Sequence, residues 1–429
     1  MKRIIQAVCI VIFLISSKIS LFCADISNSY GGVSSAFDIF TQKFEGETAF
    51  RSLLIPSGGR FEGLNGSFTA LSNDISFFDA NPAASALLKE TEINVLHNSW
   101  IADSKLETIG YTQRKNHLGW GTSLRCFYIP FTEYGHLGQK KASGYYSETF
   151  LTANIAYNFL AGYDFKGLSI GGSIKTGIRS MPPFSGQGEA ADLEYPEKQN
   201  QNASRQNGYA VLGDFGIMIR ANVSKIFYSN EPNFYFGLSL KNFGTPIKGE
   251  LPPSYISLGF AYRPVSFFLF EVDVNQGINV ANIKRSGLPY GNMGMMFSIT
   301  KYFNLLTGFG IKGGNPRFTL GGEVNLSNIQ ISANYTLDLS SQVTNISRIS
   351  IGVKFLLGQD KRDQKQNTIE KLYIQGLKEY NSKNYQRAIE IWQEILSLDK
   401  RYDPAIEGIA RAEQQLKLLE EIKKILLLD

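Results

Sequence analysis

The sequence predicts a mainly β fold: an antiparallel transmembrane β-barrel of about 14 strands with an N-terminal lumenal segment, followed by a small all-α domain. Three observations support this. The 429-residue chain has 41 glycines, 21 tyrosines and 30 phenylalanines but only 19% charged residues, which favours strands. Apolar and polar residues alternate in segments of about ten residues from Glu92 to Leu357. Helix-forming residues dominate after Gln359.

The first 24 residues have the pattern of a secretory signal peptide. Lys2 and Arg3 precede the apolar run "VCIVIFLI", and small residues lead to a boundary at Ala24. Because the run is short for a spanning helix, we expect an exported chain. A retained membrane helix and acylation of Cys23 remain open alternatives.

Composition argues against several function classes. Beyond the signal, Cys126 is the only certain cysteine, and His97, His117 and His136 are scattered, so we expect no disulfide framework, metal site or cofactor. The net charge of +5 is dispersed along the chain, so no nucleic-acid partner is expected. No nucleophile motif or catalytic triad context is present, so we expect no enzyme.

The barrel, expected over residues 91–358, is predicted from alternation. It is clearest in residues 151–159, 168–179, 268–274 and 348–357. The apolar positions should face lipid and the polar ones a wet lumen. The predicted lumenal residues include Lys175, Arg179, Glu271, Asp273 and Lys354. A soluble β-sandwich or lipocalin-like barrel is the alternative, because its strands also alternate.

The links between predicted strands differ in length at the two ends. Links such as "KNH" and "LSN" are short, whereas "TEYGHLGQKKASGYYSE", residues 182–207 and "GINVANIKRSGLP" are long. Short turns should be periplasmic, and the even strand count places both chain ends there. Aromatic residues near predicted strand ends suggest an interfacial girdle: Trp100, Tyr128, Tyr262, Tyr290 and Tyr302. "SIGVKFLL" has the loose signature of a last strand.

A linker at residues 359–367 should lead to a periplasmic helical domain at 368–429. Small and large residues there fall where a tetratricopeptide repeat places its packing positions: Gly376, Tyr380, Tyr385, Ala388, Trp392, Ile395 and Leu398. Two roles remain open. The domain could bind a periplasmic protein partner, or it could be a small helical plug at the barrel rim.

The segment "LLIPSGGRFEGLNGSFTALSNDISFFDANPAASALL" resembles the N-terminal hatch of FadL-type outer-membrane proteins. The matching positions are Gly63, Gly66, Ala70, Asp74, Asn81, Pro82 and Ala83. "LLIPSGGR" resembles the PorV branch, and the combination with a tetratricopeptide-like tail is similar to an uncharacterised spirochaetal branch.

The residues of this segment suit a plug. Asp74 and Asn81 can hold turns, Pro82 denies a strand donor, and residues 83–88 can form a short helix. The hatch should lie within residues 25–90, although residues 25–55 themselves receive no assigned role.

The resemblance implies an outer-membrane channel for long-chain fatty acids or other hydrophobic ligands, which would meet outer-membrane lipid as they leave. PorV-like relatives imply the alternative, a non-transporting scaffold that binds exported or periplasmic proteins. Arg125, Lys175 and Arg179 are candidates to bind a ligand carboxylate, because cations that face a wet lumen can pair with an acid.

Overall fold

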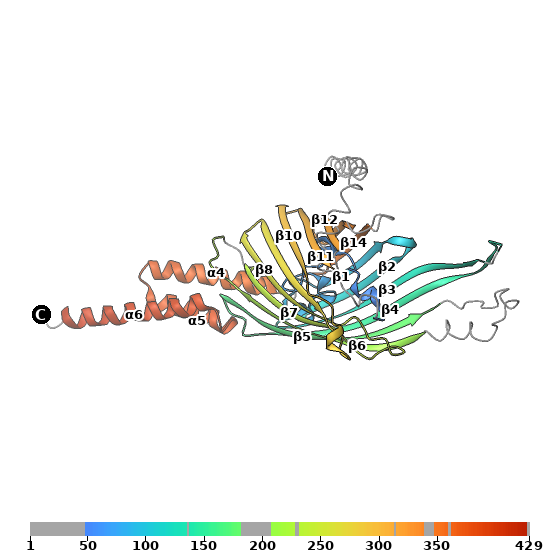
Figure 1. Cartoon of the computed structure of the whole chain (residues 1–429). Helices are drawn as coiled ribbons and strands as arrows, with labels where there is room; N and C mark the ends of the chain where they lie inside the picture. The colour runs from blue at the N-terminus through green and yellow to red at the C-terminus, as the bar shows by residue number, and fades with distance from the viewer. Residues whose placement is uncertain are drawn as a thin grey trace, which may run out of the picture.

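The computed structural model describes residues 48–134, 137–181, 207–227, 231–312, 315–338, 347–358 and 362–426. Within these residues, fourteen antiparallel strands form a closed barrel in which β1 pairs with β14 (Figure 1). The predicted mainly β class, the closed antiparallel barrel and the number of strands are therefore confirmed. The predicted signal peptide at 1–24 lies outside the described residues.

The strands follow one another around the barrel in chain order. They are β1 (Glu92–Ser99), β2 (Lys105–Lys115), β3 (Leu118–Tyr134), β4 (Lys140–Phe159), β5 (Phe165–Ser180), β6 (Gly208–Ala221), β7 (Phe234–Gly244), β8 (Tyr255–Val265), β9 (Phe268–Gly277), β10 (Tyr290–Thr300), β11 (Phe303–Lys312), β12 (Asn315–Asn325), β13 (Ile329–Asp338) and β14 (Arg348–Leu356). Two short 3-10 helices lie in the links, η6 (Ile101–Asp103) and η9 (Ile283–Arg285).

Burial alternates along the strands as the sequence predicts. The outward residues Leu151, Ile174 and Ile351 are 56%, 64% and 50% exposed, whereas the inward neighbours Lys175 and Ser350 are buried. A broad apolar outer surface and a polar inner face result, as in a barrel that contacts lipid. Among the described helices, none has the length and apolarity that a membrane span requires.

Tyr290 departs from the predicted aromatic girdle. It lines a cavity inside the barrel instead. Tyr290 begins β10 on the same face as Asn292, which lines the same cavity, because residues two apart on a strand share a face. The position of an aromatic residue near a strand end therefore did not determine the face on which it lies.

One predicted long loop, residues 132–148, is mostly strand. β3 and β4 stay paired out to Glu133 and Ala142, beyond the last pairs of β3 with β2 and of β4 with β5. This hairpin projects past the barrel rim (Figure 1). The polar residues that suggested a loop lie on a two-stranded ribbon, whose faces are both exposed to solvent. The predicted loop at 182–206 lies outside the described residues.

The hatch, here residues 48–91, fills the lumen. It contains η3 (Arg51–Leu54), α3 (Gly59–Gly63), η4 (Ile75–Phe78) and η5 (Pro82–Leu87), so the predicted helix over residues 83–88 is a 3-10 helix that begins one residue earlier. Its apolar side chains form buried clusters with inward strand residues such as Met218 and Leu306. The lumen is thus packed by protein where the sequence suggested a wet interior.

The hatch runs along the barrel from one end to the other. The Ala49 amide donates to the Leu251 carbonyl in the β7–β8 link, which belongs to the end with the long links. At the short-turn end, Arg114 donates to the Leu88 carbonyl. The chain then enters β1 at Glu92. The predicted position of the N-terminus concerns residues outside the described part.

Three helices form the C-terminal domain: α4 (Arg362–Asn381), α5 (Tyr385–Leu398) and α6 (Asp403–Leu426). Its core is centred on Trp392, which packs directly over Gly376 and Gly408. α4 starts inside the predicted linker, because the charged and amide residues after Lys361 are themselves good helix formers. Leu398 is 37% exposed and lies outside this core. Assignment as a tetratricopeptide repeat stays a prediction.

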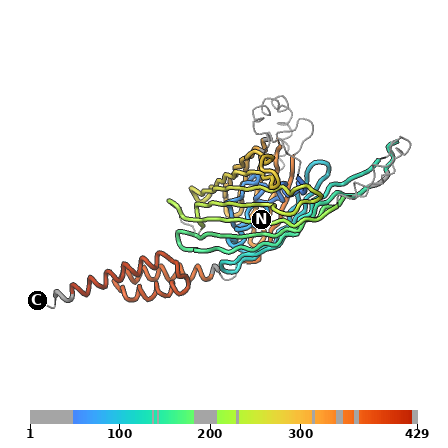
Figure 2. The backbone as a smooth tube through the Cα atoms, turned by 60° about the horizontal axis from the view of Figure 1, so that its bottom comes forward, coloured from blue at the N-terminus to red at the C-terminus, as the bar shows by residue number. Residues whose placement is uncertain are grey.

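The helical domain lies at the short-turn end of the barrel (Figure 2). The rings of Tyr163, in the β4–β5 turn, and Tyr402, before α6, meet edge to face at 5.3 Å. Gly162 lies close to the Arg401 carbonyl and the Asp403 carboxylate. Because Tyr402 also belongs to the domain core, this contact joins that core to the barrel.

Candidate functional site

Asn81 is the most heavily hydrogen-bonded residue of the predicted hatch motif. Its Nδ2 atom donates to the carbonyl oxygens of Thr69 at 2.9 Å, Ile217 at 3.2 Å and Leu238 at 3.3 Å. Its Oδ1 atom accepts from the Ala83 amide at 3.1 Å. The side chain is completely buried, and it joins two parts of the hatch to β6 and β7.

The next two motif residues contact the wall of the barrel, which is formed by its strands, through their backbone. The Pro82 carbonyl accepts from Asn154 Nδ2 at 3.0 Å, and the Ala83 carbonyl accepts from Ser169 Oγ at 2.7 Å. Short polar side chains on β4 and β5 therefore bind buried carbonyls at the start of this helix. The Asn-Pro-Ala motif anchors the hatch to four consecutive strands.

Asp74 holds a second attachment. It caps η4 by accepting from the Ser76 amide at 2.8 Å, and it pairs with Lys354 of β14 and, at 3.8 Å, with Arg60. Burial opposes ionisation of this carboxyl, but the charges of Lys354 and Arg60 outweigh that effect and lower its pKa from 3.8 to about 2. The hatch carboxylate is thus fixed as an anion.

Two further ion pairs cross between α3 and the wall. Arg60 Nε lies 2.8 Å from Glu323 Oε1 on β12, and Glu62 Oε1 lies 3.2 Å from Arg348 Nε on β14. Because these charges are buried or nearly so, each pair fixes the position of α3.

Glycines allow the hatch backbone to touch the wall. Gly63 packs so closely against Leu306 and Asn334 that a β-carbon would lie 2.5 and 2.7 Å from them. On β7, a β-carbon at Gly237 would overlap the Thr69 carbonyl group. Strand glycines whose purpose the sequence did not reveal are therefore contact points for the plug.

Glu271 and Asp273, two residues apart on β9, accept backbone hydrogen bonds from the hatch. Asp273 Oδ2 accepts from the amides of Phe68 and Thr69 at 3.0 Å each, and Glu271 Oε1 accepts from the Ala70 amide at 2.7 Å. Both carboxyl groups are fully buried. The sequence identified them as lumenal acids, and the structure shows that their partner is the hatch.

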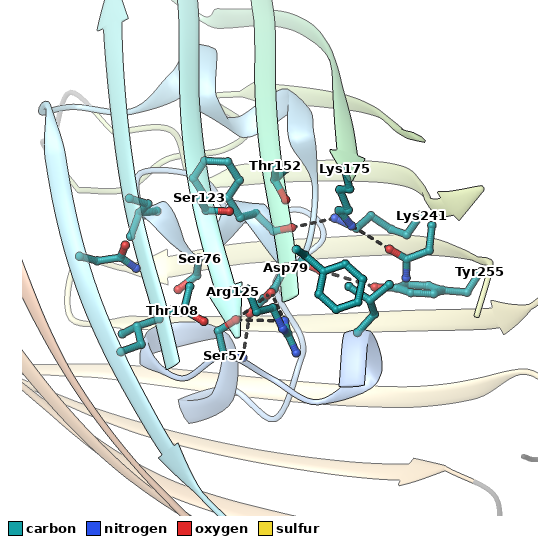
Figure 3. Close-up of a pocket in the computed structure, with 17 residues that line it drawn as sticks. Ser57, Ser76, Asp79, Thr108, Ser123, Arg125, Thr152, Lys175, Lys241 and Tyr255 are labelled. Carbon is teal, nitrogen blue, oxygen red and sulfur yellow. Dashed lines mark hydrogen bonds and ion pairs between the residues drawn. The ribbon is translucent and has the colours of Figure 1, made fainter. Parts of the chain in front are cut away.

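Arg125, a predicted ligand-binding residue, binds the hatch (Figure 3). Its guanidinium lies 2.8 Å from Asp79 Oδ1 and 3.0 Å from Ser57 Oγ, and it also donates to the carbonyls of Ser52 and Ile55. Its Nε atom is buried without a hydrogen-bond partner in the described part of the chain. The hatch thus engages both terminal nitrogens of this cation.

Lys175, the second predicted cation, lies in a buried cluster. Its Nζ atom is 2.8 Å from Asp214 Oδ2 and 2.7 Å from Asn242 Oδ1. Lys241, which the sequence analysis did not single out, lies 3.0 Å from the same Asp214 oxygen. Asn242, at a positive φ of 59°, belongs to an irregularity in the β6–β7 pairing that places Lys241 and Asn242 opposite Asp214. Two buried lysines thus share one carboxylate.

Arg179, the third predicted cation, pairs at 2.8 Å with Glu250 in the β7–β8 link. The structure therefore brings Arg125 and Lys175 to one cavity, and Arg179 is not among the residues that line it. A signal for Lys241 existed in the alternation of β7, where it is an inward cation.

Two cavities lie between the hatch and the wall. The first is lined by Arg125, Lys175, Lys241, Tyr255, polar strand residues and the hatch residues Leu53, Ser57 and Asp79 (Figure 3). The second lies between the hatch and β8–β14, and Leu53, Asp79 and Tyr255 border both cavities. The strap, defined as residues 51–57, supplies residues to both.

The second cavity has a mixed lining. Its hatch side contains the apolar residues Leu53, Leu54, Pro56 and Phe61. The wall supplies polar and aromatic groups: Tyr255, Ser257, Asn275, Tyr290, Asn292, Arg317 and Arg348. An amphipathic molecule could contact apolar and polar surfaces there at the same time.

Fold and site define the class of this protein as an antiparallel β-barrel whose lumen is plugged by its own N-terminal segment. The chain belongs to the uncharacterised protein family UPF0164, whose family model matches residues 27–360.

A UPF0164 protein of Treponema pallidum (strain Nichols) is 34% identical over 415 residues, covering 93% of this chain and 90% of that protein. A second from the same organism is 28% identical over 402 residues, covering 87% and 77%.

Solved structures also align with this chain. The Pseudomonas putida toluene transporter TodX aligns with a TM-score of 0.48 and 13% identity, over 73% of this chain and 99% of that one. A Pseudomonas aeruginosa FadL homologue aligns with a TM-score of 0.40 and 10% identity, over 70% and 98%.

Proposed function

We propose that this protein is an outer-membrane barrel that binds long-chain fatty acids or similar amphipathic hydrophobic molecules in its lumenal cavities and takes them up. The observation that carries the proposal is the pair of cavities on either side of the strap. The apolar outer surface supports a place in the bilayer. The helical domain and the short turns would then be periplasmic.

The cavities suit a ligand with an apolar body and an acidic head. The space enclosed beside the strap is small, about 30 Å³ in the first cavity and about 70 Å³ in the second, so an acyl chain fits only when the strap moves. Leu54 and Phe61 offer apolar contact in the second cavity, while Arg125 and Lys175 offer donors in the first. The carboxylate of a bound acid would lie near these two cations, which have the opposite charge. A role for Arg179 stays a prediction.

The strap would control this site. Ser52 is held by Glu148, and the carbonyls of Ser52 and Ile55 are held by Arg125. If the strap moves, the two cavities become one elongated space, because Leu53 no longer lies between them. A ligand headgroup that competes for Arg125 would weaken the contact that holds the strap.

Binding of oleate to the purified full-length protein in detergent tests the proposal. We expect wild type to bind oleate, Lys175→Gln to bind it several-fold more weakly, and both to bind oleyl alcohol equally. Arg285→Gln, an exposed cation in the β9–β10 link, is the control that should leave oleate binding unchanged. The proposal fails if wild type binds neither molecule and no lipid is carried through purification from native membranes.

A second function, a scaffold for a periplasmic protein, is favoured by α6. Its distal part extends beyond the domain core and exposes Leu418, Leu419 and Ile422. If this function is correct, a stoichiometric partner should crosslink to wild type but not to a variant with these three residues changed to serine. Retention of the same partner by that variant would argue against it.

A further inference from the structure

Arg220 lies at the short-turn end of the barrel, here called the short-turn mouth, beyond the part of the hatch that packs on β6. On the inward face of β6, Gly216 touches Asn81 and Met218 packs in a cluster with Leu87 and Leu88. Arg220 is the next inward residue, and in the sheet it is paired with Tyr235 of β7 and Gly167 of β5. The guanidinium therefore lies past the end of the plug, on the opposite side from the strap.

Within the described residues, Arg220 differs from many inward strand cations in having no acidic partner. No hydrogen bond or ion pair joins its side chain within the described residues, and its Nε atom is buried. By contrast, many inward cations each pair with a carboxylate: Arg125, Lys175, Arg179, Lys241, Arg317, Arg348 and Lys354. Arg220 is half-buried, so its guanidinium loses part of its hydration, and no anion replaces it in the part of the chain that the structure describes.

More cations than acids surround this position. Lys166, Lys225 and Arg263 lie near Arg220 and Tyr235, and Lys89 is also at this mouth. Glu231 is already engaged by Lys89 and, at 2.8 Å, by Arg263. The other acids that act on this group are Asp164 and, from the helical domain, Asp399.

The excess of positive charge contributes to a lowered pKa of Lys225, in the β6–β7 link. Burial and the neighbouring charge of Arg263 lower the pKa of Lys225. An anion at this mouth would relieve the repulsion among these side chains.

We propose that Arg220 is the centre of an anion-binding site at the short-turn mouth, which takes a carboxylate or phosphate group. A guanidinium binds either group through two parallel hydrogen bonds, and the two terminal nitrogens of Arg220, which are not among the buried atoms, can supply them. The surrounding lysines raise the local anion concentration. The site is separate from the lumenal cavities, so it does not depend on the uptake proposal.

Thermal unfolding of the full chain in detergent tests the site without a transport assay. Phosphate and acetate should each raise the unfolding temperature of wild type but not that of Arg220→Gln, because a ligand stabilises only the state that binds it. Without added anion, Arg220→Gln should unfold at the same or a higher temperature than wild type, since one charge is removed from a cluster of cations. Arg285→Gln should respond as wild type does.

Direct binding measurements give the size of the effect on anion affinity. In equilibrium dialysis with radiolabelled phosphate or acetate, Arg220→Gln should bind about tenfold more weakly than wild type. Arg220→Lys should retain part of the affinity, because it keeps the charge but loses the paired donors.

An experiment with lipid distinguishes the two sources of the anion. In nanodiscs, retention of phosphatidylglycerol by wild type and its loss from Arg220→Gln would identify a lipid headgroup, whereas binding of only phosphate or acetate would identify a free anion. The proposal is overturned if wild type binds none of these probes, or if Arg220→Gln binds them as tightly as wild type.

Discussion

Asn81 shows why an amide, and no other short polar side chain, suits the centre of the plug. Its NH₂ group has carbonyl partners on the hatch, β6 and β7, while its oxygen accepts from the Ala83 amide. Aspartate would place a carboxylate against three carbonyl oxygens, and serine is too short to reach them. At residue scale, the motif is a set of hydrogen bonds between the plug and the wall.

Asn81→Ala should therefore loosen the hatch. Removing one buried side chain with four partners leaves polar backbone groups unsatisfied, at a cost of about 2–3 kcal/mol. Chemical unfolding in detergent measures this cost. Asn328→Ala, at an exposed position in the β12–β13 turn, should change the unfolding free energy by less than about 0.5 kcal/mol. Equal effects of the two substitutions would contradict the assigned role.

The lowered pKa of Asp74 predicts that the free energy of unfolding depends on pH. Its pKa of about 2 in the folded state is below the usual 3.8, so its contribution is complete above about pH 4 and is lost as the pH falls towards 2. The difference in unfolding free energy between wild type and Asp74→Asn should shrink by about 2 kcal/mol across that window. A difference that stays constant from pH 5 to pH 2 would show that the carboxylate is not stabilised by Lys354 and Arg60.

At the scale of elements, the plug and the strands meet backbone to backbone. Gly237 on β7 faces the Thr69 carbonyl and the Ala70 Cα atom, and backbone atoms cannot rotate away as a side chain would. The acids of β9 then bind the amides of the same hatch stretch. Steric contact thus sets the position of the hatch along the barrel axis. The hydrogen bonds fix which hatch residues lie opposite which strand residues.

Gly237→Ala should displace the hatch from β7. Overpacking of a dense contact costs about 1–3 kcal/mol, and proteolysis of the hatch should become faster accordingly. Gly277→Ala, at the end of β9, is the matched control, because a β-carbon there would meet no atom within 4 Å. If both variants resist protease as wild type does, the hatch does not rest on Gly237.

For the whole molecule, the arrangement of barrel and helical domain depends on a small contact. Tyr163 extends from the β4–β5 turn to Tyr402, whose ring also packs edge to face against Tyr373 at 5.6 Å. The helical domain has its own core, so the contact orients the domain more than it folds it.

Tyr163→Ala should free the domain without unfolding it. Loss of one aromatic pair, about 1 kcal/mol, should speed amide hydrogen exchange in residues 399–406 by about fivefold. Exchange around Trp392 should not change. Tyr209→Ala, an outward-facing tyrosine at the start of β6, serves as the control, and faster exchange in both variants would contradict a specific contact.

The sequence by itself determined the fold class, the strand number and the face of most strand residues. These follow from period-two alternation, a local property that each segment carries independently. It also indicated that Asp74 and Asn81 hold turns, since each side chain accepts a hydrogen bond from the amide two residues further along the chain.

Only the tertiary structure decided the partners. Glu271 and Asp273 bind backbone amides about 200 residues away in sequence, and Lys241 and Lys175 meet at one aspartate because three strands lie side by side. Tyr290 lines a cavity, and Arg220 has no carboxylate partner within the described residues. Both facts depend on which residues the closed barrel brings near them. Alternation fixes the face of a residue, but barrel closure around the hatch determines what that face meets.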